Sequence, residues 1–356
     1  MYSKSDGILV SENILAKFLI MKAKSISELR RDVVSGDWVV IATGRAHRPD
    51  EFSKHRQTVF HQPKKICPFE KVSSDTLLVH SLDGGQKKDN WWVQVKPNKY
   101  PAFGKGLCSV FHHTGPYESS EGVGFHEVVF TRDHERTIAG MSDEETELVL
   151  RAYQERYKAL KDDACVEYVS IFHNQGRLSG ASISHPHSQI IAIPVIPPDV
   201  ARSLDGSFHY FHKHNACVHC MIVNYELREK IRIVYENKSF VVVAPYASKT
   251  AFEMRVFPKQ HSAHFEEIAD HDRLLLANAF RIALAKLSRG LKNPDLNFFL
   301  HTAPTADSSQ FNHYHWHFEI LPKTTIWAGF EIGTGIDITT ITPEAAAAFL
   351  KKIKIS

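Results

Sequence analysis

The chain has 356 residues, which is enough for two medium domains or for one duplicated unit with a large core. Its net charge of +3 and its 23% of charged residues give no reason to expect nucleic acid or membrane as a partner, and no window is apolar over the length of a transmembrane helix. The five cysteines indicate no disulfide framework, and their odd number is typical of a reducing compartment, so we expect a cytoplasmic protein.

Residues 1–27 show no recognisable element. Their short apolar run, ILAKFLI, is interrupted by Lys17 and lacks a small-residue cleavage site, which argues against a secretory signal. We expect a flexible or artefactual extension, with Met21 as an alternative start.

The pattern that follows predicts short strands in local runs with one long helix in each half. In the first half we expect strands near 37–42, 91–96, 125–131, 166–173 and 187–194 and a helix over 142–161, which begins with a capping box from Ser142 to Glu145. Residues 197–216 are polar, with prolines and an Asp-Gly pair, and are expected to link the halves. In the second half we expect strands near 231–235, 239–244, 252–258, 296–301 and 314–321 and helices over 265–289 and 343–353. This order favours an antiparallel α+β fold over a doubly wound parallel sheet.

Much of the chain consists of an internal sequence repeat with two copies. In each half a short cysteine segment, a strand that ends at a histidine, a helical stretch and a His-x-His strand follow in the same order. The first copy has these features at 67–70, 134 and 185–187, and the second has them at 217–220, 261 and 315–317. We therefore expect two related units, residues 28–196 and 217–356. The alternative is two unrelated β-rich segments with scattered histidines.

The segment HNQGRLSGASISHPHSQIIA, residues 173–192, carries the strongest chemical signal. On an extended strand, His185, His187 and Gln189 at spacing two would present two imidazoles and an amide on one face. The small and glycine residues upstream let backbone amides approach a bulky anion closely. The pattern indicates phosphate chemistry with histidine as nucleophile or proton carrier, the alternative being a surface accident.

These residues give the chain a family resemblance from about Glu28 to its C-terminus. The run from Asn174 to Gln189, NQGxxxGxSxxHPHxQ, and the opening RDVVSGDWVVIATGRAHRP resemble the galactose-1-phosphate uridylyltransferase family of the histidine-triad superfamily. The tail AGFEIGTG and the CVHC segment are most similar to the subgroup that contains plant ADP-glucose phosphorylase. The resemblance implies a duplicated histidine-triad-like unit, a homodimer and substrates that are nucleoside diphosphate sugars and hexose 1-phosphates.

The resemblance also assigns roles to single residues. It makes His187 the nucleophile that attacks the α-phosphorus, while Gln189 and Ser182 hydrogen-bond the phosphoryl oxygens. Further matched positions would contact the nucleotide or the phosphate loop, and two would contact the sugar from the neighbouring subunit. The first group is Arg45, Arg48, Asn98, Asn174 and Gly180, and the second is Phe330 and Glu331. For the arginines the alternative is a solvated turn, and for Glu331 it is a solvated carboxylate.

Two sets of residues have the donor types and spacing of zinc ligands. The second half supplies two thiolates and two imidazoles, a set suited to a structural tetrahedral site: Cys217, Cys220, His261 and His315. The first half supplies Cys67, Glu70, His134 and His185, with a glutamate where the family often has cysteine. That set either binds zinc through a carboxylate oxygen or is degenerate, with Glu70 bonded to His134. His301 and His317 are alternative ligands in the second half.

Several functions remain open at this point. The leading one is a uridylyltransferase that exchanges hexose 1-phosphates on UDP-sugars in galactose metabolism, through a covalent nucleotidyl-histidine. An ADP-sugar phosphorylase or adenylyltransferase uses the same chemistry. A histidine-triad hydrolase would pass the nucleotide to water. A zinc-stabilised binding module without turnover would not need His187 and Gln189.

Overall fold

A computed structural model describes residues 27–45, 61–70, 74–84, 90–108, 111–305 and 308–355. Among these residues, no helix combines the length and the apolar composition that crossing a bilayer requires.

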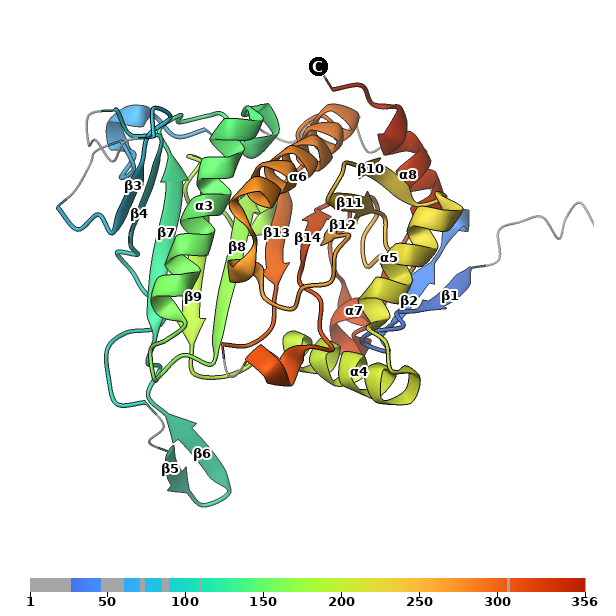
Figure 1. Cartoon of the computed structure of the whole chain (residues 1–356), viewed down its shortest axis with the longest axis horizontal. Coiled ribbons are helices and arrows are strands. Elements are labelled where there is room, and N and C mark those ends of the chain that lie inside the picture. The colour runs from blue at the N-terminus through green and yellow to red at the C-terminus, as the bar shows by residue number, and fades with distance from the viewer. Residues whose placement is uncertain are drawn as a thin grey trace, which may run out of the picture.

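One large sheet dominates the described part of the chain (Figure 1). Its ten strands are all paired antiparallel, in the order β10-β11-β12-β14-β13-β8-β9-β7-β4-β3. The strands of the first half are β3 (Leu78–His80), β4 (Val93–Pro97), β7 (Phe125–Thr131), β8 (Tyr168–Gln175) and β9 (His187–Ile193). Those of the second half are β10 (Ile233–Glu236), β11 (Phe240–Val243), β12 (Met254–Pro258), β13 (Leu296–His301) and β14 (His317–Pro322). The predicted antiparallel α+β class is confirmed.

The strand order is the same read outward from the centre in either direction. From the seam between β8 and β13, the first half continues through β9, β7, β4 and β3, and the second through β14, β12, β11 and β10. The pairings agree, because β7 lies opposite β9 with Val128 against Gln189, and β12 lies opposite β14 with Arg255 against Glu319. The two halves are therefore copies of one unit, as the repeated sequence predicts.

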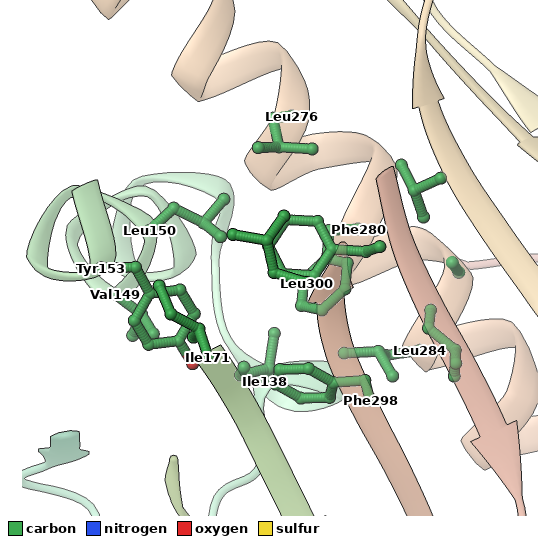
Figure 2. Packing of buried hydrophobic residues seen from close by; sticks show 14 of the residues in the cluster. Ile138, Val149, Leu150, Tyr153, Ile171, Leu276, Phe280, Leu284, Phe298 and Leu300 are labelled. Carbon is green, nitrogen blue, oxygen red and sulfur yellow. The ribbon is translucent and has the colours of Figure 1, made fainter. Parts of the chain in front are cut away.

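Two long helices cover one face of this sheet, α3 (Asp143–Leu160) and α6 (Asp270–Leu291) (Figure 1). The predicted capping box is present at the start of α3, where Ser142 accepts from the Glu145 amide and Glu145 accepts from the Ser142 amide. Figure 2 shows the core that the helices close against β8 and β13. There Phe280 lies 4.9 Å from Phe298, ring centre to ring centre, in an edge-to-face pair.

The segment that links the halves is a helix. α4 (Pro198–His214) occupies most of residues 197–216, and α5 (Val218–Glu229) begins directly after Cys217. The prolines do not break α4 because they lie at its start, where a missing amide hydrogen costs nothing. Gly206 permits close approach rather than a turn, since a Cβ there would lie 1.7 Å from the Val34 carbonyl oxygen.

Smaller elements complete the fold. A three-stranded sheet joins the two ends of the described chain, with β2 (Trp38–Ile41) between β1 (Glu28–Arg31) and β15 (Asp337–Thr339). A hairpin of β5 (Phe111–Thr114) and β6 (Tyr117–Ser120) projects from the body (Figure 1). α8 (Pro343–Lys352) begins as predicted, with Thr342 as N-cap and proline at the first position. The remaining helix is α7 (Gly329–Thr334).

Two expectations need correction. The helix expected over 265–289 starts later, because Phe265–Glu267 forms a separate 3-10 turn and α6 begins at Asp270. The cysteines are not all free, because Cys108 and Cys165 form a disulfide between the loop before β5 and the turn between α3 and β8. Their wide separation along the chain gives no spacing signal, so the sequence alone did not reveal the pair. The other three cysteines are free.

Candidate active site and metal centres

His187 is the first residue of β9, with a side chain only 8% exposed. Its Nδ1 lies 2.9 Å from the carbonyl oxygen of His185, which can only accept, so Nδ1 carries the hydrogen and Nε2 keeps a free lone pair. Burial lowers the pKa of His187, so the ring is neutral near pH 7. The geometry thus leaves a neutral imidazole with one nucleophilic nitrogen.

The spacing alone predicts that the strand presents both imidazoles on one face. The structure differs from this prediction. β9 begins at His187, and Pro186 stands between the two histidines, so His185 precedes the strand. His185 is fully buried and turns toward Cys67, while His187 and Gln189 share a strand face. The two histidines therefore serve separate sites.

The loop that leads to β9 contains two glycines in left-handed conformations, Gly176 and Gly180. A Cβ at Gly176 would lie 1.9 Å from Asp295 Oδ1, so only glycine fits there. Asp295 also accepts a hydrogen bond from the Leu178 amide at 2.7 Å, which fixes the loop to the second half. The predicted contact residue Ser182 is exposed on the same loop.

Gln189 is held by a histidine of the neighbouring strand. Its Oε1 lies 2.7 Å from His126 Nε2, and the Ala102 amide donates to His126 Nδ1 at 3.1 Å. Asn98, predicted to lie near the nucleotide, places its Nδ2 3.0 Å from the same Nε2 and accepts from the Tyr100 amide. The sequence alone does not identify His126, because a single histidine on a strand gives no signal until the strands are paired.

A cleft of about 910 Å³ opens on the sheet face opposite α3 and α6. Asn174 lines it, held by Asn297, whose Nδ2 donates to Asn174 Oδ1 at 2.7 Å. Asn174 is also close to His187, because its neighbour His173 pairs with Ser188, the residue after His187. The cleft lining includes three cationic side chains, which no sequence motif indicated: Arg202, Lys249 and Lys323. It also includes four carboxylates, so the cleft is polar and carries charges of both signs: Asp37, Asp199, Glu331 and Asp337.

The remaining predicted contact residues lie apart from His187 or outside the description. Arg45 ends a 3-10 turn over Thr43–Arg45, and its side chain, like the whole of Arg48, lies outside the described residues. Phe330 is exposed on α7. Glu331 lines the same cleft as Asn174 of its own chain, and its carboxylate accepts from the Ala328 amide at the start of α7.

Both predicted metal sets are brought together, with the ligand atoms of each set within 4.8 Å of one another. In the second half, Cys220 Sγ lies 3.3 Å from His261 Nδ1 and 3.5 Å from His315 Nδ1. Tetrahedral zinc with bonds of about 2.0–2.3 Å places its ligand atoms roughly 3.3–3.8 Å apart. Cys217, Cys220, His261 and His315 therefore fit a tetrahedral metal ion.

The first set fits less evenly. Cys67 Sγ lies 3.4 Å from His185 Nδ1, a ligand-like separation, but His134 Nδ1 lies only 2.5 Å from Glu70 Oε1. That distance suits a hydrogen bond between the two better than two ligands of one ion. The geometry thus contains the contact that the degenerate alternative requires.

The four histidines of the two sets share one arrangement. In each, Nδ1 faces the cluster and Nε2 donates to a backbone carbonyl 2.7–3.0 Å away. The acceptors are Gln62 for His134, Thr131 for His185, Asn312 for His261 and Pro258 for His315. Such outer hydrogen bonds fix the tautomer and the orientation of a metal-binding imidazole.

The thiols of the two sets differ in their acidity. A hydrogen bond from the Cys220 thiol and further ones from nearby imidazoles lower the pKa of Cys217. Burial raises the pKa of Cys67. The second set therefore offers a thiolate, the form that binds metal, more readily than the first.

Comparison with known proteins follows this geometry. Residues 18–197 match the N-terminal domain of galactose-1-phosphate uridyl transferase, and residues 204–355 match its C-terminal domain. Together with the fold, these matches define a nucleotidyltransferase. The chain belongs to the galactose-1-phosphate uridyl transferase family, which confirms the resemblance drawn from the sequence.

Its relatives include enzymes of two kinds. An ADP-glucose phosphorylase of Arabidopsis thaliana is 33% identical over 339 residues, covering 92% of this chain and 93% of that protein. A galactose-1-phosphate uridylyltransferase of Thermotoga maritima is 26% identical over 338 residues, covering 92% and 99%. The crystal structure of an Arabidopsis thaliana ADP-glucose phosphorylase with bound ADP-glucose matches with a TM-score of 0.77 and 30% identity, covering 93% of this chain and 100% of that one.

Proposed function

We propose that the protein transfers a nucleotidyl group from a nucleoside diphosphate sugar to a hexose 1-phosphate through a covalent intermediate on His187. The observation that carries the proposal is the His187 Nδ1 contact with the His185 carbonyl, which leaves Nε2 as a free, neutral nucleophile. Family membership supports the same chemistry.

The reaction divides into two displacements. Nε2 of His187 attacks the α-phosphorus, a P–N bond forms, and the P–O bond to the departing sugar 1-phosphate breaks. An oxygen of the second sugar phosphate then attacks the same phosphorus, and the P–N bond breaks to restore the imidazole. Two easier displacements thus replace one direct exchange between two anions, and the attacking group in the first is a neutral imidazole. Gln189 and Ser182 are the proposed donors to the phosphoryl oxygens.

The leading donor is a UDP-sugar, by analogy with the uridylyltransferase relatives. The second candidate is ADP-sugar phosphorolysis, with inorganic phosphate as acceptor. It is favoured by the 33% identical ADP-glucose phosphorylase and by the Cys217–Cys220 pair. Either nucleotide would use the same nucleophile, so base selection is a separate question from the reaction type.

We assign zinc to Cys217, Cys220, His261 and His315, because two thiolates and two neutral imidazoles are the donor set that zinc prefers. It would cross-link the start of α5, the loop after β12 and the segment just before β14. The Cys67 set is proposed to bind zinc only in part. The metal would act on stability rather than on the reaction.

We also propose a cytoplasmic homodimer in which Phe330 and Glu331 reach the partner's sugar. Support comes from the segment around α7, whose large apolar side chains are strongly exposed, with Ile326 at 83% and Ile332 at 74%. Exposed apolar groups of this kind are typical of an interface. Glu331 also lines the cleft of its own chain, so contact within the chain is the alternative.

The test is a panel of UDP- and ADP-sugars, each incubated with the protein and analysed by intact mass. The expected result is one added nucleotide per chain with the true donor, lost in His187→Ala and discharged by the matching sugar phosphate or by inorganic phosphate. A donor that turns over while no covalent species forms at any time would contradict the mechanism.

A further inference from the structure

The Gln189 amide can aid phosphoryl transfer in only one of its two orientations. An amide has an NH₂ end that donates and an oxygen end that accepts, and only the NH₂ end stabilises a phosphoryl oxygen. In the described part of the chain the Gln189 oxygen meets His126, and its Nε2 has no protein partner. What holds His126 therefore decides which end of the amide is free.

A backbone amide sets the hydrogen on His126. The Ala102 N–H can only donate, and it meets Nδ1 at 3.1 Å, so Nδ1 must accept. The hydrogen of the neutral ring then lies on Nε2, which donates to Gln189 Oε1 at 2.7 Å. Turning the Gln189 amide over would place its NH₂ against this N–H, donor against donor.

Asn98 does not compete for this hydrogen bond. Its Oδ1 accepts from the Tyr100 amide at 3.0 Å, so the group that it turns toward His126 is its NH₂. Two donors facing each other at 3.0 Å form no hydrogen bond. Gln189 Oε1 is therefore the acceptor for Nε2–H.

We propose that His126 is a positioning residue, which holds the Gln189 amide with its NH₂ end toward the phosphoryl group transferred to His187. The inference rests on the proposed function, since it takes Gln189 as a donor to that group. It adds two successive contacts. The loop amide of Ala102 fixes the His126 tautomer, and that tautomer fixes the orientation of the Gln189 amide.

The test compares variants by single-turnover formation of nucleotidyl-His187, with UDP-glucose and ADP-glucose as probes. His126→Leu removes the donor and should lower the rate constant at least ~10-fold, toward the ~100–1000-fold loss typical of a missing transition-state donor. His126→Gln has both an acceptor and a donor and should restore the rate to within roughly fivefold of the wild type. His112→Leu, on the exposed strand β5, is the matched control and should change nothing.

A double-mutant cycle separates positioning from a structural role. Gln189→Met removes the amide, and combining it with His126→Leu should cost no more than Gln189→Met alone, because His126 acts only through Gln189. The Kd of the nucleotide sugar and the unfolding midpoint should stay near wild type in both single variants. If His126→Leu is insoluble, His126→Glu serves in its place, because a carboxylate accepts and would turn the Gln189 amide the wrong way.

Two failures can be told apart. If Gln189→Met loses activity but His126→Leu does not, or if the two losses multiply, the positioning role is wrong and the proposed function stands. If Gln189→Met itself keeps its rate while His187→Ala loses the label, Gln189 is no donor and the positioning role falls with it. Failure to label His187 at all would overturn the proposed function.

Discussion

At the scale of single residues, the position of His187 determines its chemistry more than its identity does. The chain has 22 histidines, and many lie on its surface. His187 differs because a carbonyl takes its Nδ1 hydrogen, burial keeps the ring neutral, and the cleft residue Asn174 lies on the adjacent strand. Together these conditions suit the role of nucleophile that is proposed for His187.

The first prediction concerns this residue. His187→Ala should lower the exchange rate by several orders of magnitude, since a lost nucleophile removes the covalent route altogether. The wild type should show ping-pong kinetics in initial-rate measurements. A rate near normal in the variant, or kinetics that require both substrates bound together, would show that His187 is not the nucleophile.

The second prediction concerns His173, which lies on β8 on the helix-covered face, is 4% exposed, and stacks on Phe298. Burial lowers the pKa of His173 to about 3, against about 6.5 in an unfolded chain. The unfolded state binds the proton first, so the stability that His173 contributes is complete above pH 6.5 and falls as the pH decreases toward 3.

Between pH 6.5 and pH 5 the wild type should therefore lose about 2 kcal/mol more unfolding free energy than His173→Asn, which does not titrate. Urea denaturation at the two pH values measures the difference, and loss of metal in acid affects both proteins alike. Parallel pH dependence in the two proteins would mean that His173 is not held neutral.

The repeated sequence pattern and the family resemblance singled out His187 and the two sets of candidate metal ligands, and the structure brings the members of each set together. The sequence pattern did not give His126 its place beside Gln189, since that contact depends on β7 pairing with β9 in one register. Nor did it find Lys249 and Lys323 in the cleft, because they come from loops whose positions the whole fold sets.

At the scale of elements, the two candidate metal-ligand clusters lie at matching places in the repeat, and each brings together segments that are far apart in the sequence. The Cys217 cluster joins the start of α5 to residues that follow β12 and precede β14. The Cys67 cluster joins a loop to residues that follow β7 and precede β9. Each cluster therefore lies where the chain enters a His-x-His strand.

The third prediction concerns the Cys217 cluster of the second half. Structural zinc contributes about 10–16 kcal/mol in small domains. Losing even a quarter of that in Cys217→Ser would be roughly 3 kcal/mol and should lower Tm by roughly 5–10 °C. The rate constant for formation of nucleotidyl-His187, measured well below the unfolding temperature, should change little.

Metal analysis should find one firm zinc per chain and a partial second one. Cys67→Ser is the matched comparison and should lower Tm less, because the Glu70–His134 contact holds that cluster without metal. Protein purified without chelator that contains no zinc would contradict the assignment, and two full zinc ions would show that Glu70 is a competent ligand.

Periodicity predicted every strand of the large sheet except β3, together with β2 and the three amphipathic helices, since burial on one face leaves a clear pattern in the sequence. It did not predict the short strands β1, β3 and β15. It missed α4, because proline and an Asp-Gly pair are typical of turns, whereas here a helix starts at the proline and packs its glycine against the turn between β1 and β2. It also missed the β5–β6 hairpin, where all side chains are exposed and no alternation is present.

At the scale of the whole molecule, the exposed segment around α7 is the surface that the proposed dimer would bury. The fourth prediction is complementation between two inactive proteins, His187→Ala and Glu331→Ala. In their heterodimer one site carries both defects and the other carries neither, so the heterodimer should reach up to about half of the wild-type activity and a randomly paired mixture up to about a quarter.

The measurement is exchange activity after the two proteins are mixed and refolded together, with size-exclusion chromatography to establish that dimers form. A heterodimer that stays inactive would place Glu331 in the cleft of its own chain, where it lies beside Asn174 in this structure. A fully active monomer would rule out a shared site.

The seam between β8 and β13 has a consequence for how the two copies can differ. A single unit would leave its strand at this seam, β8 or β13, as an open edge of the sheet. If two separate, identical units paired across that edge, every substitution would appear in both units. Within one chain each position varies alone, so Gln189 beside His187 can remain an amide while Glu319, 3.4 Å from His317, is a carboxylate. Glu319 is paired with Arg255 at 2.9 Å, so covalent fusion lets one copy hold a buried ion pair at the position where the other holds the Gln189 amide.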